Sequence, residues 1–123
     1  MATNMSTVTM MVGNSEMDQL SDAVRGDGYY GYREGYHTMA IQFNNFVGRI
    51  QIEATLELEP NAADWFPIWL TPTNPYREYT AAKTGTEAFT FRGNFVLVRF
   101  RKERSYMSTT SPVGDITKVM LSI

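Results

Sequence analysis

The stretch from Arg49 to Pro60, RIQIEATLELEP, constrains the fold more than any other part of the sequence. Apolar and polar side chains alternate through it without a break. Successive side chains of a β-strand point to opposite faces, so the pattern predicts a strand with one buried and one solvated face. A helix would scatter the same apolar positions around its circumference. The residues that we therefore expect in the core are Ile50, Ile52, Ala54, Leu56 and Leu58.

Other segments carry strand patterns of the same kind. They are residues 36–43, 64–70, 87–93, 94–103 and 115–123. Pro67 cannot donate a ladder hydrogen bond, so the strand that contains it is expected at a sheet edge or a bulge. We expect Trp65 to close one end of the structure. The further core residues that we expect are Phe89, Phe91, Val96, Val98 and Phe100.

Turn-forming residues separate these segments. Asn44-Asn45 and Gly48 predict a turn just before the strand at 49–60. Gly93-Asn94 predicts a tight turn between the strands on either side of it. Prolines and small polar residues indicate long loops at 71–86 and 105–114.

Residues 1–25 are expected to form an N-terminal arm, followed by one domain over residues 26–123. Within the arm, the uncharged run 7–12 is compatible with a strand. Exposed on a monomer it would be an aggregation-prone edge, so we expect it to pair with the domain's own sheet or with a neighbouring subunit. The spacing of apolar residues in 15–26 predicts a short helix, capped by Ser15 with Asp18 three residues on, and an irregular arm is the alternative.

Short strands separated by turns, with at most one short helix, place the chain in the all-β class. Clean alternation between buried and solvated faces favours antiparallel sheets packed face to face in a β-sandwich. A length of 123 residues suits a single domain.

The composition limits the chemistry that the chain can perform. With no cysteine and one histidine, disulfides, thiolate catalysis and the common zinc sites are ruled out. A net charge of −2 gives no positive field that would attract nucleic acid, and no apolar run is long enough to span a membrane. We expect His37, alone in a strand, to be structural instead of a catalytic base. The sequence therefore predicts no enzyme activity, no metal and no cofactor.

Residues 27–37, DGYYGYREGYH, are rich in tyrosine and glycine. The glycines permit a sharp turn before the strand at 36–43. Three interpretations of the tyrosines stay open: aromatic anchors packed on the sandwich edge, a contact between subunits, or a platform for a sugar ring. The candidate interaction residues in this stretch are Tyr29, Tyr30, Tyr32 and Tyr36.

Charge is distributed unevenly between two strands. Glu53 and Glu57 share the wet face of one strand, and Arg99 and Arg101 share that of another. The simpler interpretation is that both strands lie in one sheet and the charges pair across it. The alternative is that the acidic face of one subunit meets the basic face of the next, which would build a ring or an extended array.

Three longer motifs resemble a known group of proteins. They are DGYYGYREGYHTMAIQF-NNFVGRIQIEATLELEPNAADWFPI, FTFRGNFVLVRFRKE and GDITKVMLSI, and the resemblance covers about residues 26–123. The pattern is similar to small virion structural proteins of tailed bacteriophages, especially the cyanobacterial myophage type. More distantly, the order resembles the galactose-binding-like or discoidin-like jelly roll, which does not by itself imply sugar binding.

The resemblance implies a jelly-roll β-sandwich that binds other virion proteins and copies of itself. It would serve as a multi-copy assembly or decoration subunit of the capsid, neck, tail or baseplate, located in the virion and assembled in the host cytoplasm. The alternative function is a carbohydrate-binding module that the virion uses for host attachment. A hydrolase on a jelly-roll scaffold is the third.

Overall fold

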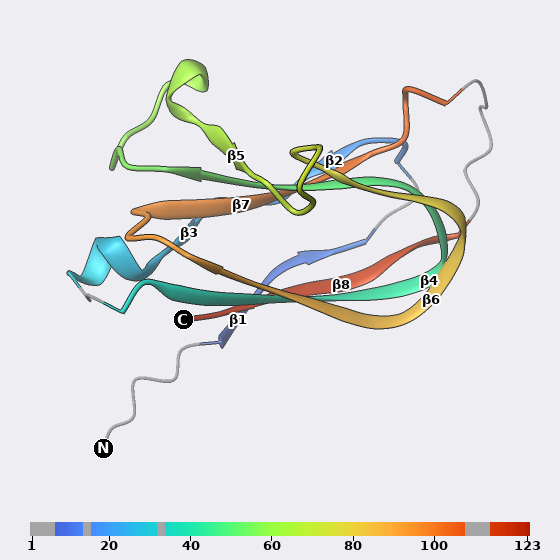
Figure 1. The fold of residues 1–123 in the computed structure, drawn as a ribbon, viewed down its shortest axis with the longest axis horizontal. Helices are drawn as coiled ribbons and strands as arrows, with labels where there is room; N and C mark the ends of the chain where they lie inside the picture. The colour runs from blue at the N-terminus through green and yellow to red at the C-terminus, as the bar shows by residue number, and fades with distance from the viewer. Residues whose placement is uncertain (1–6, 14–15, 32–33, 108–113) are drawn as a thin grey trace.

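A computed structural model describes residues 7–13, 16–31, 34–107 and 114–123 of the chain. The described part is built from strands and two short 3-10 turns, which confirms the predicted all-β class (Figure 1). The elements are β1 (Thr7–Val12), β2 (Gln19–Leu20), β3 (Val24–Arg25), η1 (Asp27–Tyr30), β4 (Tyr36–Thr55), η2 (Ala62–Asp64), β5 (Phe66–Ile68), β6 (Arg77–Arg92), β7 (Leu97–Glu103) and β8 (Asp115–Ser122).

The long strands β4 and β6 run side by side through both layers of the molecule (Figure 1). The first half of β4 pairs with β8, and β8 pairs with β1. The second half of β4 pairs with β7 on one edge and with β5 on the other. β2 and β3 add to the far edge of β7. The result is one antiparallel sheet, curled into a half-barrel whose two layers face each other.

The bend that joins the two layers lies where the sequence predicted a turn. Asn44, Asn45 and Gly48 do not end the strand, so that prediction was wrong: β4 continues through them, and its register with β6 shifts between Phe43 and Gly48. Asn45 has φ 53° and Gly48 has φ 150°, conformations that asparagine and glycine tolerate better than other residues. These residues bend the strand and shift its register with β6, and regular pairing continues on both sides of the bend.

Two other predicted boundaries were also wrong. Residues 77–86 were expected in a loop, but they form the first part of β6, where pairing with β4 outweighs their weak strand propensity. Gly93-Asn94 does not form a hairpin, because the end of β6 pairs with the start of β4 at Tyr36, whereas the start of β7 pairs with the end of β4 at Thr55. The connection instead crosses between layers: the Gly93 N–H donates to Gly35 O, and the Val96 N–H donates to Thr55 O.

The core lies between the two layers and contains most of the predicted residues. Among those expected there, Ile50, Ile52, Ala54, Val98 and Phe100 are fully buried. Phe89, Phe91 and Val96 are half-buried, and so is Trp65, which does not belong to the core cluster. Leu56 and Leu58 were wrongly expected in the core: β4 ends at Thr55, and these side chains are 64% and 62% exposed.

The first part of the chain joins the sheet. β1 pairs with β8, so the run at 7–12 lies against the domain's own sheet, one of the two partners expected for it. The short helix predicted at 15–26 is absent from the described residues 16–26, which contain β2 and β3. Asp18 does not cap a helix; its carboxylate accepts hydrogen bonds from the Arg104 and Ser105 N–H groups, next to the end of β7. Ser15 lies outside the described residues.

Candidate functional site

A buried hydrogen-bond network joins the two described ends of the tyrosine-rich turn between β3 and β4, residues 27–31 and 34–37. The N–H of Asp27 donates to His37 Nε2 at 2.9 Å, so the proton of the ring lies on Nδ1, which donates to Gly35 O at 2.9 Å. The Asp27 carboxylate in turn accepts the Gly35 N–H at 2.5 Å. Burial lowers the pKa of His37, which favours the neutral ring that this network requires.

Aromatic rings enclose the same histidine. His37 stacks on Phe91 with ring centroids 5.2 Å apart, and Phe95 packs against both rings. Gly26 and Gly28 come so close to the backbone of Asn94 and Phe95 that a Cβ on either would clash. The turn is therefore held on several sides, and His37 anchors it from within the core.

The exposed tyrosines stand on this fixed base. Tyr29 and Tyr30, in η1, contact edge to face at 5.2 Å, and the Arg25 guanidinium lies 4.4 Å from the centre of the Tyr29 ring. Tyr36 begins β4, is 53% exposed and is covered on one side by Arg92 at 4.9 Å. Tyr32, the fourth candidate, lies outside the described residues. The turn thus presents tyrosine rings and guanidinium groups together.

A shallow hollow of about 250 Å³ lies beside the turn. Arg25 and Tyr30 line it together with apolar side chains from three strands and the end of the chain. The apolar residues are Val8, Ala23, Val24, Leu121 and Ile123. We call Arg25, Tyr29, Tyr30, Tyr36 and this hollow the tyrosine-turn surface.

The candidate charges of the two strands are brought together within one chain. Glu53 lies opposite Arg99 in the β4–β7 pair. Its Oε1 accepts from Arg99 Nε at 2.6 Å and from Arg101 Nη2 at 3.4 Å. Glu57 lies beyond the end of β4 and is exposed. The simpler interpretation, pairing across one sheet, therefore holds for Glu53, and a role for the four residues in contacts between subunits stays a prediction.

A buried ionic cluster that the sequence patterns did not predict lies at the end of β7. Lys102 and Arg104 have fully buried side chains, and Asp115 at the start of β8 lies 2.9 Å from Lys102 Nζ and 3.6 Å from Arg104 Nη2. Burial lowers the pKa values of both cations, although Asp115 counteracts it. The alternation that buries Val98 and Phe100 continues to Lys102 and Arg104, so it could have indicated that their side chains face the core.

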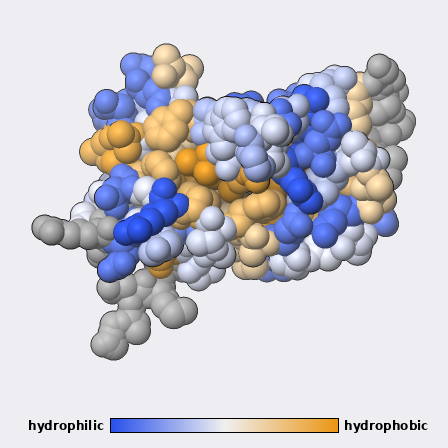
Figure 2. All heavy atoms as spheres, in the orientation of Figure 1, coloured by the Kyte–Doolittle hydropathy of each residue, from blue (hydrophilic) through white to orange (hydrophobic). Residues whose placement is uncertain are grey.

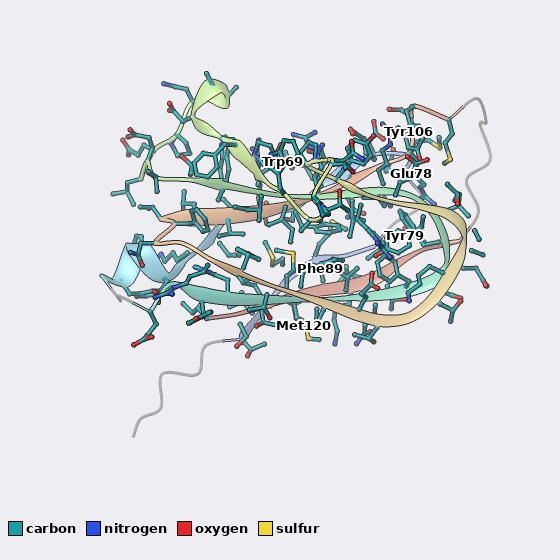
Figure 3. All side chains as sticks on the ribbon, in the orientation of Figure 1. Trp69, Glu78, Tyr79, Phe89, Tyr106 and Met120 are labelled. Carbon is teal, nitrogen blue, oxygen red and sulfur yellow. The ribbon has the colours of Figure 1, made fainter. Side chains whose placement is uncertain are left out.

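The sequence patterns also did not predict an apolar strip on one face of the molecule. Figure 2 shows apolar side chains gathered over β5 and in the gap between the two layers, and Figure 3 places Phe89 in that gap. Leu56 and Leu58 are exposed just after β4. Three partly buried residues in β5 or next to it pack against the core: Phe66, Ile68 and Leu70.

A second group of tyrosines lies at the opposite end of the molecule. Figure 3 shows Glu78 and Tyr106 there, far from η1. The Arg49 guanidinium lies 4.2 Å from the Tyr76 ring centre and 3.9 Å from that of Tyr106, and its Nε donates to Glu78 at 3.1 Å. These rings help to hold the arginine in place.

Within the described residues, no three histidine, cysteine, aspartate or glutamate side chains come together as a metal site would require. None of the described residues forms a helix that is long and apolar enough to cross a membrane.

The fold and these surfaces define an all-β protein of the antiparallel sandwich type. No protein-family model matches the chain, and neither does any curated protein. A solved structure that resembles it is the K1 cleaved adhesin domain of Lys-gingipain from Porphyromonas gingivalis W83, at 15% sequence identity and a TM-score of 0.41. The match covers 85% of this chain and 61% of that one, and at this TM-score it assigns neither a family nor a function.

Proposed function

We propose that the protein is a non-enzymatic binding module that assembles with other proteins through its tyrosine-turn surface. The observation that carries this proposal is that exposed tyrosines stand on a turn fixed from inside by His37 and Asp27. Tyrosine and arginine are enriched in protein interfaces because they offer large contact area together with hydrogen bonds.

The anchoring of residues 27–31, which include Tyr29 and Tyr30, favours binding. A flexible loop would lose conformational freedom when a partner docks, whereas an anchored turn has already lost it on folding. Arg25 further restricts Tyr29 by stacking on its ring. The neighbouring hollow, with apolar walls and a polar edge at Arg25 and Tyr30, has the character of a pocket for an apolar side chain of a partner.

The specific role that we propose is that of a multi-copy structural subunit of a tailed-phage virion, assembled in the host cytoplasm without a cofactor. The support for it is the resemblance of residues 26–123 to small virion structural proteins. In this chain the matching motifs form strands of the sheet: NFVLVRFRKE contains β7, and GDITKVMLSI contains β8. They build the scaffold that carries the tyrosine-turn surface.

The test compares two tyrosine variants for binding to phage particles assembled without the protein. Tyr29→Ser with Tyr30→Ser should lower binding in co-sedimentation by at least about tenfold, the loss expected for a tyrosine anchor that contributes about 1.4 kcal/mol. Tyr106→Ser is the matched control, because Tyr106 is comparably exposed at the other end of the molecule. Equal binding by both variants contradicts the role of the turn.

A glycan array separates this proposal from the carbohydrate-binding alternative. Saturable binding of the isolated protein to a glycan, lost in the Tyr29→Ser and Tyr30→Ser protein, would replace assembly by host attachment as the function. One face of the Tyr29 ring is already covered by Arg25 and one face of Tyr36 by Arg92, which leaves less ring surface for a sugar.

A further inference from the structure

The outer edge of β6 is a long row of backbone groups. β6 runs from Arg77 to Arg92, and one of its edges pairs with β4. Among the residues that the structure describes, no strand pairs with the other edge. An open strand edge is a template for a further strand, which natural proteins either block or use.

The order of charges along β6 is self-complementary. Around Gly85, Lys83 and Glu87 stand two positions away on either side, and Glu78 and Arg92 stand seven positions away. If a second β6 ran antiparallel with Gly85 opposite Gly85, Lys83 of each copy would face Glu87 of the other. Glu78 and Arg92 lie at matching distances from the centre, but β6 has extra residues between Tyr79 and Lys83 relative to β4, so the charge match of this register rests on Lys83 and Glu87.

The uncharged residues agree with the same register. It places Thr84 opposite Thr86 of the second copy, and Tyr79 and Phe91 lie on the same face of β6. Residues directly opposite in an antiparallel pair lie on the same face of the sheet. Lys83, Glu87 and Phe91 are all partly buried, whereas Thr84, Thr86 and Ala88 are exposed, so faces of like character meet. Threonine pairs are favourable cross-strand neighbours.

Neighbouring registers that keep the faces aligned lack this match. Moving the centre to Lys83 or to Glu87 places two like charges directly opposite each other. Moving it to Thr84 or to Thr86 leaves every charged residue opposite an uncharged one. A two-residue step in register thus loses all of the opposite-charge pairs, and like charges facing each other oppose association.

The geometry at the centre permits a close approach. Gly85 has φ 113°, and nothing lies within 4 Å of the position that a Cβ would occupy there. β6 bends together with β4 near this point (Figure 1). A two-fold axis perpendicular to the sheet keeps the concave faces of both copies on the same side, so the two bends follow each other. Residues 80–82, where β6 departs from regular pairing with β4, carry only short side chains.

We infer that two copies of the chain pair antiparallel through their β6 edges about Gly85, forming an isologous dimer with one continuous sheet. This inference deepens the proposed assembly function by assigning a surface to contacts between copies, and it leaves the tyrosine-turn surface free for other proteins.

Charge reversal tests the dimer in the isolated protein by sedimentation equilibrium over a concentration series. The wild-type chain should reach twice its mass of 14.0 kDa. Lys83→Glu should raise the dissociation constant roughly thirtyfold, because an attractive pair becomes repulsive twice in a symmetric dimer. Lys83→Glu combined with Glu87→Lys should restore dimerisation. Lys118→Glu, on β8, is the matched control and should leave the mass unchanged.

Single cysteines test the register, since the chain has none of its own. Thr84→Cys and Thr86→Cys proteins, mixed and oxidised, should form a mixed disulfide, because opposite Cα atoms lie about 4.5–5.5 Å apart. Thr86→Cys alone should cross-link far less, because its own copies sit diagonally at about 7–8 Å. Equal cross-linking of Thr86→Cys alone overturns the register.

A monomer at all concentrations, or a dimer indifferent to Lys83→Glu and to the double exchange, overturns the inference. Neither result affects the proposed function, which depends on particle binding by the tyrosine-turn surface. Conversely, loss of particle binding is measured with Tyr29→Ser and Tyr30→Ser, which lie outside β6 and should leave the dimer intact.

Discussion

Replacing Asp115 by asparagine should destabilise the protein far more than replacing the lysine that it contacts. Asp115 is the carboxylate that faces both Lys102 and Arg104, whose side chains are completely buried while that of Asp115 is 31% exposed. Asp115→Asn keeps the size and a hydrogen-bond acceptor but removes the negative charge. Two buried cations then lose the carboxylate with which both form ion pairs and which offsets part of their desolvation.

The magnitude follows from the burial of the partners. Breaking a buried ion pair by removing one member costs about 3–5 kcal/mol. Because water reaches part of Asp115, the lower end applies, and we expect a loss of about 3 kcal/mol in the free energy of unfolding. For a domain of this length that corresponds to a melting temperature lower by about 10 °C. Urea unfolding followed by fluorescence measures the first quantity, and a thermal scan measures the second.

Lys102→Met is the informative counterpart. It removes a cation whose burial already lowers its pKa, and it fills the same space with an apolar chain. The expected change in the free energy of unfolding lies between about zero and a gain of 1 kcal/mol. Asp22→Asn, an exposed carboxyl between β2 and β3, is the control and should change stability by less than about 0.5 kcal/mol. A large loss with Lys102→Met, together with none for Asp115→Asn, would refute the reasoning.

Three further predictions concern other parts of the fold. Burial lowers the pKa of His37 below 6.5, so the unfolded chain takes up a proton first and the free energy of unfolding should fall as pH drops below about 6.5; His37→Gln should lack this slope in pH-dependent urea titrations. Phe100→Ala should cost about 3–5 kcal/mol in urea unfolding, whereas Leu58→Ala should cost less than about 0.5 kcal/mol. Glu53→Gln should cost about 1 kcal/mol, less in high salt, and a loss insensitive to salt would contradict an ionic origin.

Local alternation predicted strand faces well but could not locate strand ends. The pattern at 49–60 continues unchanged through Leu56 and Leu58, yet the strand stops at Thr55. The last cross-strand partner of β4 is Leu97, opposite Thr55, and the chain beyond has nothing to pair with in the β4–β7 ladder. The end of a strand is decided by its neighbours in space, and a single segment does not contain that information.

The bend and the buried cations illustrate a second limit. Asn45 and Gly48 permit either a turn or a bent strand, and the pairing of β6 along both halves of β4 selects the bend. Lys102 and Arg104 continue the buried face of β7, but lysine and arginine alone suggest a surface. Asp115, at the start of β8, offsets the cost of their burial, and the carbonyl oxygens of Glu16 and Gly114 accept hydrogen bonds from Arg104. Both features depend on contacts between distant segments.

For the candidate interaction residues, too, the local turn could be predicted from the sequence and the contacts with distant segments could not. The glycines around Tyr29 and Tyr30 predicted a sharp turn, and the structure contains one, with left-handed Gly31 and Gly35. The sequence did not reveal that His37 anchors this turn from the core. The anchor needs Phe91 and Phe95, which approach it from elsewhere in the chain.

The position of β8 has a consequence for folding during synthesis. β8 lies between β1 and β4, so it is inserted into the layer after both of its neighbours have been made. Until residues 115–122 emerge from the ribosome, β1 lacks its partner and its uncharged residues are available to other nascent chains. Pairing between such distant segments forms slowly. We therefore expect chaperone dependence and aggregation of the nascent chain to be concentrated in the interval before β8 appears.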